Sequence, residues 1–233
     1  MLPVRLAKLL PAALLAALLL PASPAHADLI GTTSSADAVL KNKCFHHPIN
    51  YSFVVGPGTL LWQTKISLVS PGGRTSEGID LSSVDSDATS GTVTVLLCGS
   101  IDPGIWTVHT TGTYQVLPAV NIPISVADST FRVRRTATRT SLASKHLTGQ
   151  HYRLIATVKD RRSSGFKPTS SAEVAFQRRV DGVWKTIRGS RAETDRGIAT
   201  AVVSVPAGTR VRAVTAHAGY LGGSASRGVR VHP

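Results

Sequence analysis

The sequence predicts an all-β protein whose mature part consists of two tandem β-sandwich domains. Two observations predict this fold class. Apolar residues alternate with polar ones in short segments along most of the chain, which is typical of half-buried strands. Turns rich in Gly and Pro separate these segments at even spacing, and no amphipathic helix of useful length is expected after residue 27.

The N-terminal segment has the three parts of a secretory signal peptide. Arg5 and Lys8 supply positive charge, residues 9–20 form a largely apolar run, and Ala25-His26-Ala27 supplies small residues before a cleavage point. The run is shorter than the roughly twenty apolar residues that a transmembrane helix needs. We therefore expect residues 1–27 to be a cleaved signal peptide and the mature chain to lack a transmembrane segment. A buried N-terminal helix is the alternative.

In residues 28–135 the alternating segments are expected to be strands. They span residues 49–55, 62–68, 93–97, 106–110 and 131–135. Turn formers between them, such as Gly56-Pro57-Gly58 and Asp102-Pro103-Gly104, let the chain reverse because their φ angles are permissive or fixed. We expect the large rings of Trp62 and Trp106 to fill the core between two sheets.

Residues 136–233 alternate in the same way, and about seven short strands fit this half. Its apolar faces are expected to contain Tyr152, Leu154, Ala156, Val158, Val174, Phe176, Val183, Ile187, Val203, Val205, Val211, Ala213, Val229 and Val231. Trp184 lies in an alternating segment and is also expected in the core. A Trp ring that faced outward near Tyr114 or Tyr220 would instead offer a platform for carbohydrate.

The domain boundary is expected after Arg135. Residues 131–135 alternate between apolar and polar side chains as the last strand of the first domain would, and the Thr- and Ala-rich stretch 136–140 resembles a connection into the second domain. Residues 28–135 then hold seven Lys or Arg against eight Asp or Glu, a net charge of −1. Residues 136–233 hold seventeen against five, a net charge of +12. The basic character of the mature protein therefore resides in its second domain.

Many of these cations occupy positions that should point outward from a sheet. The candidate anion-binding residues are Arg153, Lys159, Arg178, Arg179, Arg210, Arg212 and Arg230. Because Arg forms bidentate hydrogen bonds with phosphate and carboxylate oxygens, we expect an anionic cell-envelope polymer or another extracellular protein as partner. No specific nucleic acid is expected, since the sequence offers no recognition helix and few aromatic residues for stacking. A basic surface that only keeps the protein soluble is the alternative.

No catalytic residue, metal site or cofactor is expected. The sequence has no Gly-x-Ser-x-Gly elbow, no His-Glu-x-x-His motif and no phosphate-binding Gly-x-x-x-x-Gly-Lys loop. His46 and His47 are adjacent, so in a strand they point to opposite faces and cannot readily share one ion. Asp80, Asp85 and Asp87 offer oxygen ligands for a candidate calcium site, although the stretch lacks the spacing of a dedicated calcium loop.

Four motifs of the second half follow one another along the chain. They are Val174-Ala175-Phe176-Gln177-Arg178-Arg179, Gly182-Val183-Trp184-Lys185-Thr186, Thr194-Asp195-Arg196-Gly197 and Arg210-Val211-Arg212-Ala213. This series resembles the bacterial Ig-like module common in secreted actinobacterial proteins, and residues 62–73 with 103–108 are similar to the sandwich that precedes it there. The resemblance implies two tandem Ig-like or jelly-roll-type sandwiches and an envelope-associated binding role, without a defined ligand.

Cys44 and Cys98 are the only cysteines, and the oxidising environment of an exported protein favours a disulfide between them. Two separate buried thiols are the alternative. The order Cys44, Trp62, Cys98 matches antibody domains, but Leu96 stands where those domains place a tyrosine, and Cys44 precedes its strand. We therefore expect a local staple and not the inter-sheet bridge of antibody domains.

These features together predict a secreted, non-enzymatic binding protein, extracellular or associated with the cell wall, whose basic second domain contacts an anionic partner. One alternative is a structural spacer without a specific ligand. A second is a secreted hydrolase with a dispersed Ser, His and Asp triad, because such triads are set by geometry and not by sequence order.

Overall fold

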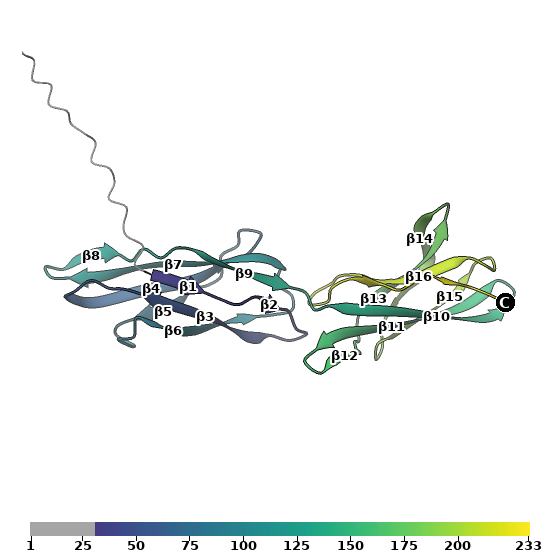
Figure 1. The fold of residues 1–233 in the computed structure, drawn as a ribbon, viewed down its shortest axis with the longest axis horizontal. Coiled ribbons are helices and arrows are strands. Elements are labelled where there is room, and N and C mark those ends of the chain that lie inside the picture. Colours follow the sequence, from purple (N-terminus) through teal and green to yellow (C-terminus); the bar gives the residue numbers. More distant parts are fainter. Residues whose placement is uncertain (1–30) are drawn as a thin grey trace, which may run out of the picture.

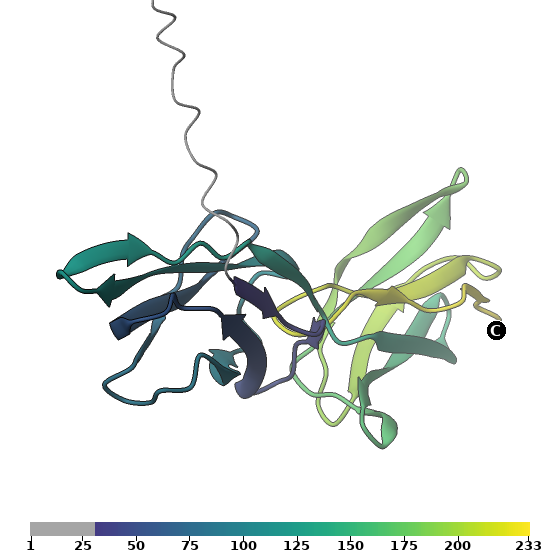
Figure 2. The same ribbon diagram turned by 60° about the vertical axis from the view of Figure 1, so that its left-hand side comes forward.

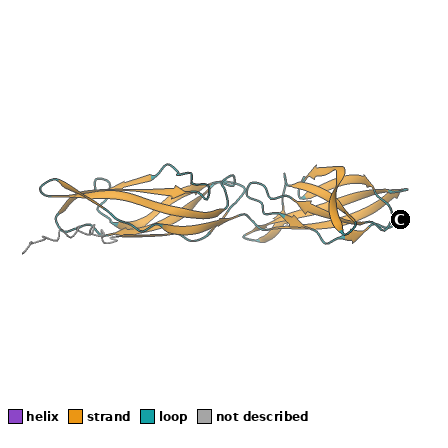
Figure 3. Cartoon of the chain, turned by 90° about the horizontal axis from the view of Figure 1, so that it is seen from above, coloured by secondary structure: helices purple, strands orange, loops and turns teal. Residues whose placement is uncertain are grey.

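The computed structural model describes residues 31–233, which form strands and turns throughout (Figures 1 and 3). The predicted all-β sandwich fold is confirmed for these residues. The signal-peptide prediction for residues 1–27 lies outside them. No helix that could cross a membrane occurs between residues 31 and 233.

Between residue 31 and the connection at residues 135–137, the structure contains nine strands. They are β1 (Gly31–Ser34), β2 (Ala38–Val39), β3 (Phe45–Phe53), β4 (Thr59–Val69), β5 (Ile79–Ser82), β6 (Ser90–Leu97), β7 (Gly104–Val116), β8 (Val120–Pro123) and β9 (Ser129–Arg134). One sheet has the order β1-β3-β6. The other has the order β2-β9-β7-β4-β5, with β8 paired to β7. These two sheets form the N-terminal sandwich.

Nine more strands follow the connection. They are β10 (Thr138–Thr148), β11 (His151–Arg162), β12 (Gly165–Pro168), β13 (Glu173–Val180), β14 (Val183–Glu193), β15 (Ile198–Ser204), β16 (Arg210–Thr215), β17 (Ser224–Ala225) and β18 (Val229–Arg230). One sheet has the order β10-β11-β12 with β15 on β11, and the other has the order β14-β13-β16-β17 with β18 on β16. These two sheets form the C-terminal sandwich, which lies end to end with the first (Figure 1).

Both sandwiches use the same connections between their seven main strands. The first, second and fifth strands form one sheet, as β1-β3-β6 and as β10-β11-β15. The fourth, third, sixth and seventh form the other, as β5-β4-β7-β9 and as β14-β13-β16-β18. No sheet joins strands from the two sandwiches within the part of the chain that the structure describes. The fold is therefore one architecture built twice.

The alternation read from the sequence places the expected residues in the two cores. In the C-terminal sandwich Leu154, Val174 and Phe176 have no exposed surface, and they pack with the other buried residues of β11, β13 and β16. Trp62 and Trp106 are buried in the N-terminal sandwich, as predicted. Strand alternation carries this information because successive side chains point to opposite faces of a sheet.

Two expected core positions are wrong. Val183 is 59% exposed and Trp184 is only partly buried. Both lie in the hairpin of β13 and β14, which stands away from the rest of the sandwich (Figures 1 and 2). The register of this hairpin shifts between Ala175 and Gln177. Beyond the bulge Val183 pairs with Val180 and Trp184 pairs with Arg179, so these two adjacent side chains point to opposite faces of the hairpin.

The predicted disulfide between Cys44 and Cys98 is present. The two cysteines flank Phe45 and Leu97, which face one another across the β3 and β6 pair. The bond therefore joins neighbouring strands of one sheet. This arrangement confirms the expected local staple and differs from the bridge between sheets in antibody domains.

Candidate anion-binding surface

The C-terminal sandwich gathers four of the predicted cations on the outer side of its five-stranded sheet. Val211 is fully buried, so Arg210 and Arg212 on either side of it point outward. Arg230 lies opposite Arg210. Arg179 and Arg212 point the same way because Gln177, two residues before Arg179, pairs with Arg212. We call Arg179, Arg210, Arg212 and Arg230 the arginine face.

Trp184 lies beside the arginine face and contacts one of its guanidinium groups. It lies opposite Arg179 on the neighbouring strand, and the guanidinium carbon of Arg212 lies 4.5 Å from its ring centre. The Nε of Arg212 also donates a hydrogen bond to Oε1 of Gln177 at 2.9 Å. Stacking and hydrogen bonding hold this guanidinium in place without neutralising its charge. The alternation of residues 183–187 predicted this tryptophan in the core, and nothing in the sequence indicated its place beside the arginines.

The other two predicted outward cations lie on the opposite sheet. Arg153 pairs with Lys145 across β10 and β11, and Lys159 pairs with Arg139. The guanidinium carbon of Arg139 lies 4.0 Å from the ring centre of Phe166. We call Arg139, Lys145, Arg153 and Lys159 the second basic face. Its two members on β10, Arg139 and Lys145, were not predicted, because residues 136–140 were expected to connect the domains and not to begin a strand. Their alternation with Leu142 was a usable signal.

Arg178 belongs to neither face. It pairs with the buried Val211, so its side chain points to the inner side of the sheet, where the projecting hairpin leaves it exposed. The seven predicted cations therefore do not form one site. The register divides them between two opposite outer faces and one isolated position.

Four cross-strand pairs of the C-terminal sandwich join two cations. They are Arg139 with Lys159, Lys145 with Arg153, Arg178 with Lys185, and Arg210 with Arg230. Like charges directly opposite one another destabilise a sheet, by roughly 0.2–1 kcal/mol for a pair. The paired strands of the N-terminal sandwich contain no such pair between residues 31 and 134.

The acidic residues of the C-terminal sandwich do not neutralise these cations. Its ion pairs join Asp160 to Arg162, Glu173 to Arg191, and Asp195 to Arg196. None of the eight paired cations, and no member of the arginine face, forms an ion pair with a carboxylate of residues 31–233. Their positive charge is thus available to a ligand.

The predicted calcium ligands do not converge. Asp80 lies in β5, and Asp85 accepts a hydrogen bond from Oγ of Ser82 at 2.6 Å. Between residues 31 and 233 no three His, Cys, Asp or Glu side chains, Asp87 included, form a group able to hold a metal ion.

The adjacent histidines point to opposite sides of β3, as expected. His46 is exposed, whereas His47 is 4% exposed and stacks on Phe131 with ring centres 4.9 Å apart. Nε2 of His47 lies 2.7 Å from Oγ of Ser35. Burial lowers the pKa of His47 below its usual value. His47 is therefore a packed residue of the N-terminal sandwich.

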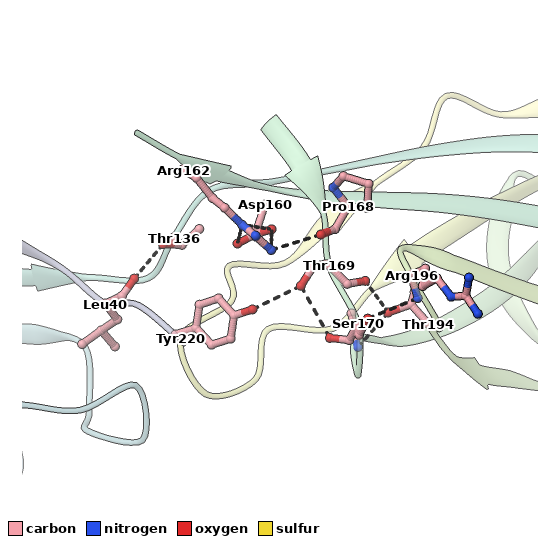
Figure 4. Close-up of polar contacts among 11 residues, drawn as sticks. Leu40, Thr136, Asp160, Arg162, Pro168, Thr169, Ser170, Thr194, Arg196 and Tyr220 are labelled. Atoms are coloured by element: carbon pink, nitrogen blue, oxygen red, sulfur yellow. Dashed lines mark hydrogen bonds and ion pairs between the residues drawn. The ribbon is translucent and has the colours of Figure 1, made fainter. Parts of the chain in front are cut away.

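The two sandwiches meet at residues 135–137 (Figure 4). Oγ1 of the buried Thr136 donates a hydrogen bond to the carbonyl of Leu40 at 2.6 Å, and its backbone N–H donates to the carbonyl of Tyr220 at 2.7 Å. Tyr220 packs against the cores of both sandwiches, and its hydroxyl lies 3.1 Å from Oγ1 of Thr169. Hydrogen bonds and shared packing thus join the sandwiches directly.

A groove of about 660 Å³ lies beside this junction. Lys41 and Lys43 line it from the N-terminal sandwich, and Arg161 and Arg162 line it from the end of β11. Among residues 31–233, the only carboxylate in its lining is that of Asp160, which pairs with Arg162. We call this space the junction groove.

No protein-family model matches the chain, and no curated protein matches it either.

Proposed function

We propose that this protein is a secreted, non-enzymatic binding protein whose C-terminal sandwich attaches it to an anionic polymer of the cell envelope. The contact is made by the arginine face, which holds one of the four cation pairs, and by the second basic face, which holds two of them. Attachment through guanidinium groups to repeated phosphates or carboxylates depends on salt, because bound counterions are released.

The single observation that carries this proposal is the set of cation pairs on neighbouring strands. Each pair costs stability in the free protein, and a polyanion that lies across the strands would remove that cost. A sheet selected only for stability or solubility would intersperse charges of both signs. The N-terminal sandwich lacks such pairs, which supports a division of roles between the two halves.

The proposed origin and location rest on separate features. The shared order of the seven strands supports the resemblance to bacterial Ig-like modules of secreted actinobacterial proteins. The disulfide supports an extracellular location, since such bonds persist in oxidising compartments. Export through the segment at residues 1–27 remains part of the proposal, and mass spectrometry of the protein recovered from culture medium tests it.

Co-sedimentation with isolated bacterial cell walls across a salt series tests the attachment. The variant Arg179→Gln/Arg210→Gln/Arg230→Gln removes three charges from the arginine face. We assume that each of the three cations contacts one charged group of the polymer. The plot of the logarithm of the binding constant against the logarithm of the salt concentration should then become shallower, and the magnitude of its slope should decrease by roughly 2, at about 0.7 for each lost contact.

A matched control removes three exposed cations from the N-terminal sandwich. Lys65→Gln/Arg74→Gln/Arg132→Gln lowers the net charge equally and should leave sedimentation close to that of the unchanged protein. Equal loss in both variants would show that only net charge matters, and the arginine face would then be refuted as the site.

The same experiment tests the alternative functions. No sedimentation at low salt would refute attachment and favour the structural spacer. Labelling of the folded protein by a serine-reactive probe would favour the hydrolase.

A further inference from the structure

The junction groove has the charge of a binding site for a polyvalent anion. Four cations line it against one carboxylate, which leaves a net charge of +3 in a concave space between two sandwiches. Ligand sites occur preferentially at such boundaries between domains, where side chains from separate segments converge. The groove belongs to neither basic face described above, because two of its four cations come from the N-terminal sandwich.

The backbone holds both sides of the groove at fixed positions. On one side, the N–H of Leu40 donates to the carbonyl of Arg134 at 2.8 Å, and the carbonyl of Leu40 accepts from Thr136. On the other side, the N–H of Arg161 donates to the carbonyl of Ala137 at 2.9 Å. The lysine side and the arginine side are thus bonded to the same short connection.

Both ends of the segment that carries Lys41 and Lys43 are held in place by bonds to other parts of the chain. Leu40 is fully buried and bonded as described, and Cys44 is fixed by its disulfide to Cys98. Lys41 and Lys43 lie between these anchors with exposed side chains. Because the loop backbone is already ordered, binding an anion here costs entropy chiefly in the side chains that it fixes and little in the backbone.

Two of the lining residues, Asp160 and Arg162, form an ion pair whose charges cancel. The side chain of Asp160 is 5% exposed, and its carboxylate accepts from Nε and an Nη of Arg162 at 3.2–3.3 Å. The same guanidinium donates to the carbonyl of Pro168 at 3.1 Å (Figure 4). Arg162 is therefore occupied, and the charges left for a ligand are those of Lys41, Lys43 and Arg161.

We infer that the junction groove binds a small phosphate-bearing ligand with two or more negative charges. Three cations can balance a condensed phosphate group, whereas a single carboxylate would leave most of their charge unmet. Lysine contributes a compact ammonium with three donors and arginine a planar fork, and together these suit the many oxygens of phosphate groups. This site does not depend on the arginine face, so it stands whether or not that face binds a polymer.

Calorimetric titration of the full chain with sodium tripolyphosphate at low salt tests the inference. The groove variant Lys41→Gln/Lys43→Gln/Arg161→Gln should weaken binding at least about tenfold. The arginine-face variant, which loses the same number of charges, should weaken it less than about threefold. Equal weakening in the two variants, or no binding to the unchanged protein, would overturn the site.

Two further measurements keep the test independent of how the groove variant folds. Citrate carries a similar charge on carboxylates alone, so citrate binding as tight as that of tripolyphosphate would overturn the phosphate assignment. In proton–nitrogen NMR spectra of the unchanged protein, tripolyphosphate should shift the amide signals of residues 41–43 and 161–163. Shifts confined to β13, β16 and β18 would place the phosphate elsewhere and refute the groove.

Discussion

The carboxylate of Asp160 depends on a single partner, and removing that partner should destabilise the protein strongly. The Asp160 side chain is 5% exposed, whereas that of Arg162 is 47% exposed. Among residues 31–233, Arg162 alone donates hydrogen bonds to this carboxylate. The variant Arg162→Met keeps much of the aliphatic stem and leaves a buried, unpaired charge.

The expected cost follows from the geometry. At 3.2 Å and an effective dielectric constant of about 20, the attraction between the two charges is about 5 kcal/mol. Water at the exposed guanidinium reduces this value, and breaking buried pairs costs about 3–5 kcal/mol. We therefore expect Arg162→Met to lower the free energy of unfolding by about 3 kcal/mol. Asp160→Asn should cost only about 1 kcal/mol, because the arginine it frees is solvated.

Urea unfolding, followed by circular dichroism and by tryptophan fluorescence, measures both variants. The double variant Asp160→Asn/Arg162→Met should recover most of the loss, since no unpaired charge remains. Arg161→Met is the matched control, and its exposed side chain without an ion pair should change stability by less than about 0.5 kcal/mol. A cost for Arg162→Met that is no larger than that for Asp160→Asn would refute the argument from burial.

Four other predictions follow from single contacts. Replacing Cys44 and Cys98 together by Ser should cost about 4 kcal/mol in urea unfolding, because the bond closes a loop with a sequence separation of 54 residues; no loss would contradict the chain-entropy account. The pKa of His47 is lowered by burial, so the unfolded chain binds more protons and stability should fall as pH drops below about 6.5. Thermal unfolding from pH 8 to pH 5 checks this, and His47→Gln should flatten the dependence. The hydroxyl of Tyr152 is buried without a hydrogen-bond partner among residues 31–233, so Tyr152→Phe should leave stability unchanged or raise it by about 1 kcal/mol, and a loss would show that the hydroxyl is paired. Thr136→Val removes the hydrogen bond across the junction and should cost about 1–2 kcal/mol in thermal unfolding, whereas no change would show that the bond contributes nothing.

The alternation of apolar and polar residues within single segments was enough to predict the strands. Leu154, Val174 and Val211 were expected on inner faces because their neighbours along the chain are polar or point away, and each is fully buried. The period of two is a property of a single strand, so it needs no knowledge of which strands pair. The same pattern gave the outward positions of Arg210 and Arg230.

The two failures at the β13 and β14 hairpin have different causes. Trp184 lies opposite Arg179 on the outer side of its sheet, and because it is adjacent to Val183 the two cannot share one face. Val183 lies opposite Val180 on the inner side, yet it is 59% exposed because the hairpin stands away from the rest of the sandwich. Whether an apolar face is buried depends on how far the opposing sheet extends. Sequence alternation contains no information on that extent.

The candidate binding sites, too, could be predicted only in part from the sequence. Composition alone located the excess of cations in residues 136–233, because charge adds up regardless of fold. Only strand register decided that Arg153 and Arg210 lie on opposite sheets and that like charges face one another. The junction groove could not be predicted from the sequence, since Lys41 and Arg161 belong to different sandwiches.

By itself, then, the sequence determined the all-β class, the sides of most strands, the disulfide partners and the half of the chain that carries the charge. Each of these depends on residue type and on spacing along one segment. Tertiary structure decided which cations share a face, which carboxylate is buried and where the two sandwiches enclose a groove. Those features depend on pairing between segments distant in the chain, and the free energy of such pairing belongs to the whole fold and not to any one segment.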